Sequence, residues 1–218
     1  MKIFLDTANL AEIREGMASG LIAGVTTNPA LAAKEGRAFP ALLQEILGMT
    51  DCRPVFAEVL STDAEGMVAE GQQLAAISPR IVVKIPAIWA GFQAVKRLSA
   101  LGIQTAVTLV YSPAQALLAE VAGATYVAPF LGRAQDVGID GFATLEQIAA
   151  QYRKAGAQTQ ILAASIRTAQ DGFRAALLGA DCLTASLKVV KAMASHPQTD
   201  VTLHSFLTEY AKVADINS

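Results

Sequence analysis

The sequence predicts an α/β fold, a single (β/α)8 TIM barrel with an additional C-terminal helix, and three observations lead to this prediction. Short β-branched or apolar runs recur eight times, and segments of helical period separate them. The chain of 218 residues leaves about 27 residues for each strand and helix, which suffices for a crossover helix and little decoration. A flavodoxin-like doubly wound sheet is the alternative fold, although it normally has fewer strands.

The eight runs are mostly continuous in apolar residues and do not alternate with polar ones. Such runs are typical of parallel strands that are covered on both faces. In chain order the predicted strands are residues 3–5, 24–27, 55–59, 81–85, 106–109, 126–128, 160–164 and 182–184.

The segments between the runs have recognisable helix starts. Three pairs of residues are spaced like a capping box, in which a side chain at the helix start and one three residues later bond each other's backbone. These pairs are Asn9 with Glu12, Thr62 with Glu65, and Thr144 with Gln147.

The last segment, Thr199 to about Val213, predicts an additional amphipathic helix. Its apolar residues on roughly one side include Phe206 and Tyr210. Such a helix could close the barrel or contact another subunit, and on this feature we favour a homo-oligomer.

One domain is expected for residues 1–218, with 199–218 as a C-terminal helical extension. Hydrophobic residues make up 53% of the chain and charged residues 17%, which provides enough apolar surface for one buried core. Residues 98–119 carry no charge and reach the length of a membrane span. Polar residues and Pro113 interrupt them, so we predict a strand followed by a helix and no membrane contact.

Compartment and macromolecular partners follow from similar observations. The chain enters a strand-like run at once, without the apolar region of a signal peptide, so a cytoplasmic location is expected. Cys52 and Cys182 form no C-x-x-C pair and are interpreted as reduced core thiols. The net charge is −2, and the scattered Lys and Arg residues predict no nucleic-acid partner.

In a barrel of this class, functional side chains lie at the C-terminal ends of the strands and in the loops that follow. An unpaired buried charge costs several kcal/mol, so ionisable groups at these ends need an explanation. The strand ends carry Asp6, Thr26 to Asn28, Glu58, Lys84, Thr108, Phe130 to Arg133, Ser165 to Arg167, and Thr184 to Ser186.

Lys84 is the most informative of these residues, because apolar residues precede it and Ile85 and Pro86 follow. It could be a snorkelling or ion-paired lysine. Alternatively it could attack a carbonyl carbon as a neutral amine, a form that apolar burial or a nearby cation favours. Asp6 and Glu58 could transfer protons beside it, or could be ion-pair partners or acids at helix starts.

Two arginines, the positions of the histidines and the lack of nucleotide-binding motifs indicate the class of substrate and cofactor. Arg133 and Arg167, with the Ser165 hydroxyl, could hold a sugar phosphate, although surface arginines are common. The two histidines, His196 and His204, lie in the C-terminal tail, and no dinucleotide or P-loop motif follows a strand. We therefore expect neither a metal nor a cofactor, which leaves iminium formation as the obvious electron sink.

Several motifs, in this order, resemble the transaldolase family, and more narrowly its short-chain branch, which also contains fructose-6-phosphate aldolase. The resemblance extends from Met1 to about Tyr210. The motifs are Leu5-Asp6-Thr7-Ala8, Gly24-Val25-Thr26-Thr27-Asn28-Pro29, Phe56-Ala57-Glu58-Val59, Val82-Val83-Lys84-Ile85-Pro86, Pro129-Phe130-Leu131-Gly132-Arg133 and Ala163-Ala164-Ser165-Ile166-Arg167.

The resemblance implies a fold, an assembly and a role for each site residue. It implies a ring-forming homo-oligomer, a pentamer or decamer, and sugar-phosphate substrates. Lys84 would form a Schiff base at the ketose C2, and Asp6 would take the C4 hydroxyl proton as the C3–C4 bond breaks. The remaining implied roles are water positioning by Glu58 and Thr108, sugar binding by Thr26 and Asn28, and phosphate binding by Arg133, Ser165 and Arg167.

The type of reaction is less determined. Glu58 with Phe130 resembles the transaldolase pattern. Fructose-6-phosphate aldolases differ from this pattern and have Gln and Tyr at these two positions. Ala106, Ala128 and Ser186 depart from the usual Asn, Ser and Pro. Transaldolase is the leading hypothesis, and a fructose-6-phosphate aldolase-type enzyme and a non-catalytic sugar-phosphate-binding barrel are the alternatives.

The loop after the lysine strand is also unusual for the family. Trp89 stands in a segment that is usually more polar, and we expect that it could reshape the mouth of the pocket.

Overall fold

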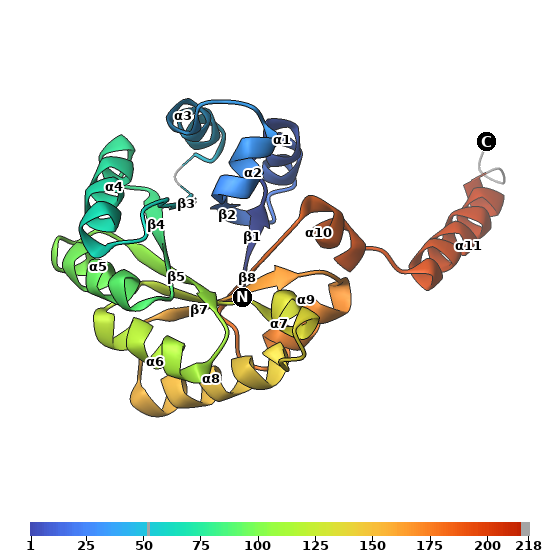
Figure 1. The fold of residues 1–218 in the computed structure, drawn as a ribbon. Coiled ribbons are helices and arrows are strands. Elements are labelled where there is room, and N and C mark those ends of the chain that lie inside the picture. Colours follow the sequence, from blue (N-terminus) through green and yellow to red (C-terminus); the bar gives the residue numbers. More distant parts are fainter. Residues whose placement is uncertain (52, 215–218) are drawn as a thin grey trace.

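The computed structural model describes residues 1–51 and 53–214, and its core is one closed barrel (Figure 1). All neighbouring strands are parallel, and β1 pairs with β8, so the sheet has no free edge. The eight predicted strands are confirmed, and the doubly wound alternative is wrong. The strands are β1 Lys2–Asp6, β2 Ile22–Thr26, β3 Val55–Glu58, β4 Ile81–Pro86, β5 Thr105–Val110, β6 Tyr126–Pro129, β7 Gln160–Ile166 and β8 Cys182–Ala185.

Helices surround the barrel, as the alternating pattern predicted (Figure 1). Two short helices, α2 and α7, directly follow β2 and β6 and so lie at the C-terminal ends of the strands. The helices are α1 Leu10–Ala18, α2 Pro29–Lys34, α3 Phe39–Met49, α4 Ala64–Ile77, α5 Trp89–Ala100, α6 Pro113–Ala122, α7 Leu131–Asp136, α8 Gly141–Ala155, α9 Ala169–Leu177, α10 Leu187–Met193 and α11 Pro197–Ala214.

Of the three predicted helix starts, only Asn9 is an N-cap. Its side chain accepts hydrogen bonds from the backbone N–H groups of Ala11 and Glu12. The capping box remains incomplete, because the Glu12 carboxylate accepts from the Thr7 hydroxyl instead, at 2.6 Å.

The other two predicted caps are wrong. Asp63 caps α4 in place of Thr62, and Asp140 caps α8 in place of Thr144. Aspartate is as good an N-cap as threonine, and the Thr144 hydroxyl donates inside the helix to the Asp140 carbonyl.

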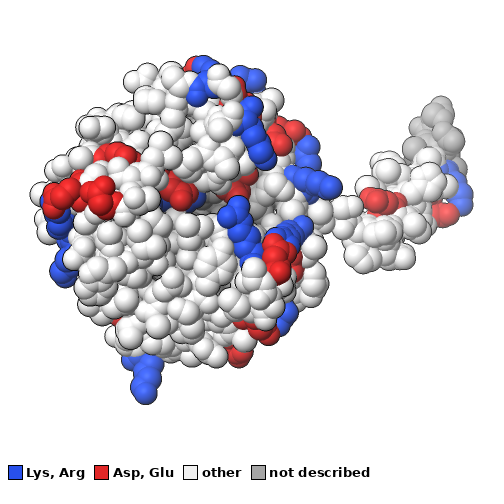
Figure 2. All heavy atoms as spheres, in the orientation of Figure 1, with Lys and Arg blue, Asp and Glu red and all other residues white. Residues whose placement is uncertain are grey.

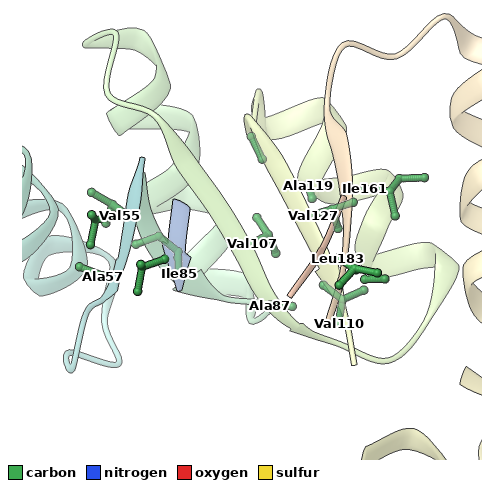
Figure 3. Packing of buried hydrophobic residues seen from close by; sticks show 14 of the residues in the cluster. Val55, Ala57, Ile85, Ala87, Val107, Val110, Ala119, Val127, Ile161 and Leu183 are labelled. Carbon is green, nitrogen blue, oxygen red and sulfur yellow. The ribbon is translucent and has the colours of Figure 1, made fainter. Parts of the chain in front are cut away.

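The outward-facing residues of the strands pack against the helices and form the larger apolar core. Figure 3 shows Val55 and Ala57 of β3, Ile85 of β4, Val107 of β5 and Leu183 of β8 in this layer. Both faces of the sheet are therefore covered, which explains why the strand sequences do not alternate between apolar and polar residues.

Inside the barrel, three aromatic rings form what we call the aromatic floor: Phe4, Phe56 and Tyr126. The ring centroids of Phe4 and Phe56 are 5.2 Å apart and those of Phe56 and Tyr126 are 5.0 Å apart, with the rings edge to face. Gly24 lies against this floor, because a Cβ there would approach the Phe4 ring to 3.0 Å and the Pro54 carbonyl to 2.4 Å. The interior is thus a packed layer and not a pore.

Side chains alternate between the two faces of a strand, so residues two positions beyond the interior apolar layer also face inward. Asp6 follows Phe4 in this way, and Lys84 follows Val82. Because the strands are parallel, all these second residues reach the same end of the barrel. We call them the mouth layer: Asp6, Thr26, Glu58, Lys84, Thr108 and Thr184.

Helix α11 stands apart from the barrel (Figure 1). Residues 197–212 are exposed except for half-buried Thr202, and the apolar side chains of Phe206 and Tyr210 are 68% and 73% exposed. The predicted extra helix is confirmed and begins two residues earlier, at Pro197. The idea that it closes the barrel is wrong, because it leaves the barrel after α10.

The remaining sequence predictions concern the thiols and the uncharged stretch. Cys182 is a buried free thiol, whereas Cys52 lies outside the described residues, as do residues 215–218. Residues 98–119 form the end of α5, then β5, then most of α6. No described helix is both long and apolar enough to cross a membrane. On the face in Figure 2, Lys and Arg side chains are interspersed with Asp and Glu.

Candidate active site at the barrel mouth

A cavity of about 80 Å³ opens at the C-terminal ends of the strands. Every site residue predicted from the sequence lines it, except Glu58 and Arg167. The lining residues are Asp6, Thr26, Asn28, Lys84, Thr108, Ala128, Phe130, Arg133, Leu162, Ala164, Ser165 and Thr184.

Lys84 projects from β4 into this cavity and is 7% exposed. Its Nζ donates to the backbone carbonyl of Thr27 at 2.8 Å and lies 3.1 Å from Glu58 Oε2. Glu58 and Lys84 are paired residues of β3 and β4, so the sheet itself brings the acid to the amine. The sequence left an ion-paired lysine and a nucleophile as alternatives, and the geometry combines an ion pair with access to the cavity.

The ionic neighbour of Lys84 is therefore an anion and not the cation considered from the sequence. A carboxylate 3.1 Å from the amine is within direct proton-transfer distance. Because the side chains of Lys84 and Glu58 are only 9% and 14% exposed, little solvent competes for this proton.

Thr108 of β5 is the next group along the barrel wall. Its side chain is fully buried, and its hydroxyl has no hydrogen-bond partner among the described residues. A buried hydroxyl without a partner is costly by about 1–3 kcal/mol, so such groups usually have a role for water or ligand. Thr108 lines the cavity and can bond a water or substrate hydroxyl there.

At the ends of β1, β2 and β8, the side chains of Asp6, Thr26 and Thr184 form a hydrogen-bonded group. The Thr26 hydroxyl donates to Asp6 Oδ1 at 2.8 Å and lies 2.6 Å from the Thr184 hydroxyl. Thr184 was noted at the end of β8 but was given no role from the sequence. Its position at a strand end was the one sequence signal for a role. The hydrogen bond itself could not be predicted from local sequence, because its partner Thr26 lies 158 positions away.

Asn28 lines the cavity and also caps a helix. Its side-chain oxygen accepts from the backbone N–H of Leu31 in α2, at 2.9 Å. The capping bond occupies the oxygen and leaves the side-chain NH2 group available for a ligand.

The ends of β5 and β7 have unusual backbone. Leu109 and Ser165 both have a φ of 58°, and each lies where the strand register shifts. A left-handed conformation disfavours residues other than glycine by roughly 1–2 kcal/mol. Leu109 follows Thr108 directly, and Ser165 itself lines the cavity. The regular pairing of β5 with β6 and of β7 with β8 is therefore interrupted at the cavity wall.

Helix α7 approaches β7 closely at Ser165. A Cβ on Gly132 would lie 2.5 Å from the Ser165 carbonyl oxygen and 2.7 Å from Arg167 Nε, so only glycine permits this contact. The backbone N–H of Arg133 donates to Ser165 Oγ at 3.2 Å, and the Arg133 guanidinium lies 5.3 Å from the Phe130 ring centroid.

Arg167 takes a different position from Arg133. Its guanidinium forms a two-point ion pair with Asp136 of α7, with Nη1 2.6 Å from Oδ1. This hydrogen bond lowers the pKa of Asp136 below its ordinary value. Arg167 therefore does not line the cavity, and its guanidinium is occupied by Asp136 in this structure.

The departures from the family pattern have different surroundings. Ala128 lines the cavity, and Ala106 is paired with Lys84 in the sheet. Ser186 caps α10 by accepting from the backbone N–H of Val189. The expectation for Trp89 is wrong, because it begins α5 and is 72% exposed in a surface groove, away from the mouth cavity.

In the part of the chain that the structure describes, no group of three or more His, Cys, Asp or Glu residues could hold a metal ion. The absence of a cofactor stays a prediction of the sequence.

The chain is similar to known proteins along nearly its whole length. A probable transaldolase from Moorella thermoacetica is 53% identical, with 98% of this chain and 99% of that protein covered. Another probable transaldolase, from Heliobacterium modesticaldum, is 49% identical, with 99% and 100% covered.

A crystal structure from Coccidioides immitis, described as that of a candidate deoxyribose-phosphate aldolase, superposes with a TM-score of 0.63. It is 18% identical and covers 88% of this chain and 84% of its own, which supports the barrel fold alone. The model of the family Transaldolase/Fructose-6-phosphate aldolase matches residues 3–217. The chain therefore belongs to the transaldolase/fructose-6-phosphate aldolase family.

Proposed function

We propose that this enzyme is a transaldolase that transfers a dihydroxyacetone unit from a ketose phosphate to an aldose phosphate through a Schiff base on Lys84. The observation that carries the proposal is the buried Lys84 amine at the barrel mouth, 3.1 Å from Glu58 and in one cavity with Asp6. No metal or cofactor takes part in the proposed reaction.

In the first half-reaction, the Lys84 amine attacks C2 of the ketose, and loss of water produces an iminium ion. Glu58 is the acid closest to the amine and is proposed to move these protons, with a water held by Thr108. The iminium then accepts the C3–C4 electron pair while Asp6 takes the proton of the C4 hydroxyl. The first product leaves, and a dihydroxyacetone enamine remains on Lys84.

In the second half-reaction, the enamine carbon attacks the aldehyde carbon of the acceptor. Asp6 returns its proton to the new hydroxyl, and water hydrolyses the iminium to release the product and free Lys84. Thr26 and Asn28, which line the cavity, are proposed to bind the sugar hydroxyls.

The phosphate is proposed to bind at the α7 side of the cavity. Arg133 and Ser165 line this side and are joined by a hydrogen bond, and Phe130 lies beneath the Arg133 guanidinium. Arg167 would join them by exchanging Asp136 for a phosphate oxygen, because guanidinium binds both anions with the same two-point geometry.

The choice of transfer over cleavage rests on Glu58 and on the relatives, which are named probable transaldolases. A specific observation favours the second candidate, a fructose-6-phosphate aldolase-type enzyme that releases dihydroxyacetone. Ala128, which resembles the aldolase pattern, lines the cavity and removes a hydroxyl beside the bound sugar.

One experiment separates these candidates. The protein is incubated with fructose 6-phosphate and borohydride, the reduced adduct is mapped by mass spectrometry, and dihydroxyacetone is assayed with and without erythrose 4-phosphate. An adduct on Lys84 with turnover that requires the acceptor is expected. Release of dihydroxyacetone without the acceptor would indicate the aldolase, and the absence of an adduct with any ketose phosphate would indicate a non-catalytic barrel.

We also propose a homo-oligomer in the cytoplasm, a pentamer or decamer, with α11 as a contact to another copy of the chain. Phe206 and Leu207 are exposed on α11, and the helix stands off its own barrel (Figure 1), so a second copy can bury this apolar face. Phe206→Glu is expected to shift the mass in light scattering toward the monomer. The same change at exposed Phe173 of α9 is the control, and equal masses for both variants would contradict the contact.

A further inference from the structure

A continuous chain of hydrogen bonds crosses the inner wall of the barrel from β8 through β2 to β1. Thr184 Oγ1 lies 2.6 Å from Thr26 Oγ1, and Thr26 Oγ1 lies 2.8 Å from Asp6 Oδ1. Each threonine hydroxyl has a single proton to donate, and an ionised carboxylate can only accept. Thr26 therefore gives its proton to Asp6, and Thr184 must supply the proton between the two threonines.

The direction of this chain is consequently determined by its members. Both threonines are buried, with 5% of Thr184 and 2% of Thr26 exposed, so bulk solvent has little access to their hydroxyls. Threonine is branched at Cβ and has few side-chain conformations. Hydrogen bonds in a row polarise one another in such a low-dielectric setting, which strengthens the bond that reaches Asp6.

We propose that Thr184 is a positioning residue for Asp6. Its hydroxyl occupies the acceptor side of Thr26, so that the one Thr26 proton is held toward Asp6 Oδ1. The inference rests on the proposed function, in which Asp6 exchanges a proton with the C4 hydroxyl of the sugar. Thr184 acts on this step through Thr26 and takes no part in Schiff-base formation at Lys84.

The same geometry assigns the reacting oxygen of Asp6. Oδ1 accepts from Thr26, whereas Oδ2 has no protein hydrogen-bond donor within the described ranges. The C4 hydroxyl proton therefore goes to Oδ2, while the O–H electron pair forms the C4 carbonyl and the C3–C4 pair moves into the enamine. In the second half-reaction Oδ2 returns this proton to the new hydroxyl.

Three charged groups lie near Asp6 at the barrel mouth. Lys84 from β4 and Arg133 from α7 line the same cavity, and Glu58 from β3 lies beside Lys84. From the flanking strands β2 and β8, the cavity receives only the hydroxyls of Thr26 and Thr184. Loss of the Thr184 hydroxyl therefore removes one hydrogen bond and changes no charge in the cavity, so a change in kcat reports the hydrogen-bond chain itself.

The test uses Thr184→Val, which keeps the shape of the side chain and removes its hydroxyl. The kcat for transfer to erythrose 4-phosphate is expected to fall about tenfold, the rate equivalent of roughly one hydrogen bond, with KM changed less than about twofold. The borohydride-trapped adduct on Lys84 is expected to form as in the unchanged protein.

Three further variants make the result specific. Thr184→Ser retains the hydroxyl and is expected to restore most of kcat. Thr184→Ala removes the hydroxyl with no steric demand, so it gives the same test if the valine variant does not fold. Thr105→Val is the control, because Thr105 is a buried threonine of β5 whose hydroxyl has no partner among the described residues.

Each contrary outcome has a separate meaning. A kcat that is unchanged in both Thr184→Val and Thr184→Ala would overturn the positioning role. Loss of the Lys84 adduct together with activity would also overturn it and indicate a structural role for Thr184. If the unchanged protein forms no adduct on Lys84, the proposed function fails, and this inference fails with it.

Discussion

The aromatic floor and the mouth layer are both built on strands of the barrel, and on the two strands that carry both they lie two residues apart. Phe4 precedes Asp6 on β1, and Phe56 precedes Glu58 on β3. The floor is held by edge-to-face rings 5.0–5.2 Å apart. The mouth is held by hydrogen bonds and one ion pair. The difference shows that one barrel interior contains two layers with opposite requirements.

The floor removes apolar area from water and therefore stabilises the fold. The mouth buries polar groups, which is favourable only where each one has a partner. Lys84 and Asp6 have partners, whereas the Thr108 hydroxyl has none among the described residues. Polar groups that would be unfavourable in a core chosen for stability are a common property of functional sites.

The largest expected effect tests the mouth layer alone. Lys84→Met removes the amine, so the reduced adduct should disappear and transfer activity should fall by at least about 1,000-fold, as for the loss of an essential nucleophile. The measurements are adduct mapping and steady-state kinetics, with circular dichroism to verify folding. Lys96→Met, at an exposed position on α5, is the matched control, and equal losses in both variants would contradict the role of Lys84.

The second expected effect tests the floor alone. Phe56→Ala leaves a cavity between two rings, so the free energy of unfolding should fall by about 3–5 kcal/mol, while activity at a temperature where the variant is folded stays near normal. Urea unfolding and kinetics at the same temperature check this. Phe173→Ala, at an exposed position on α9, should change neither quantity much. A loss of activity without a loss of stability would contradict the hypothesis that the floor stabilises the fold and the mouth layer carries the chemistry.

A smaller effect is expected at the edge of the mouth. Asp136→Asn releases Arg167 from its ion pair, so KM for a ketose phosphate should fall roughly two- to fivefold, as for the loss of one exposed competing ion pair. Stability should change little, because both side chains are about half exposed. Asp200→Asn on α11 is the control. An unchanged KM would indicate that Arg167 does not reach the phosphate.

The smallest effect concerns the pH response of the floor and of Cys182, which is buried in the same apolar cluster as the three rings. Burial raises the pKa of the Cys182 thiol to about 12, and burial also raises the pKa of Tyr126. A raised folded-state pKa means that the folded protein keeps protons which the unfolded chain loses, so stability should be constant below about pH 9 and fall above it. Urea midpoints from pH 7 to 10.5 check this direction.

Thiol labelling provides an independent measurement of the same property. Iodoacetamide should label Cys182 at least about 100-fold more slowly in the native protein than in urea at pH 8.5, because the thiolate is the reactive form. Peptide mapping distinguishes Cys182 from Cys52. Fast native labelling of Cys182 would show that the floor is open to solvent.

The residue pattern was sufficient to predict the barrel and the end of it at which the polar side chains gather. Eight apolar runs predicted eight strands, because branched and apolar side chains favour a sheet that is covered on both faces. The alternation of side chains, together with parallel strands, then places Asp6, Lys84 and Thr108 at one end of the barrel. These properties depend on residues within a few positions of one another, so they can be read locally.

Only the tertiary structure decided which partner each polar group has. Thr184 reaches Thr26 across 158 positions because barrel closure pairs β8 with β1, which also pairs with β2. Arg167 pairs with Asp136 and not with the cavity, because Gly132 lets α7 approach β7. The direction of α11 away from the barrel (Figure 1) likewise could not be predicted from the residue pattern. A pattern of residue types states which contacts are chemically possible, and the closed geometry selects among them.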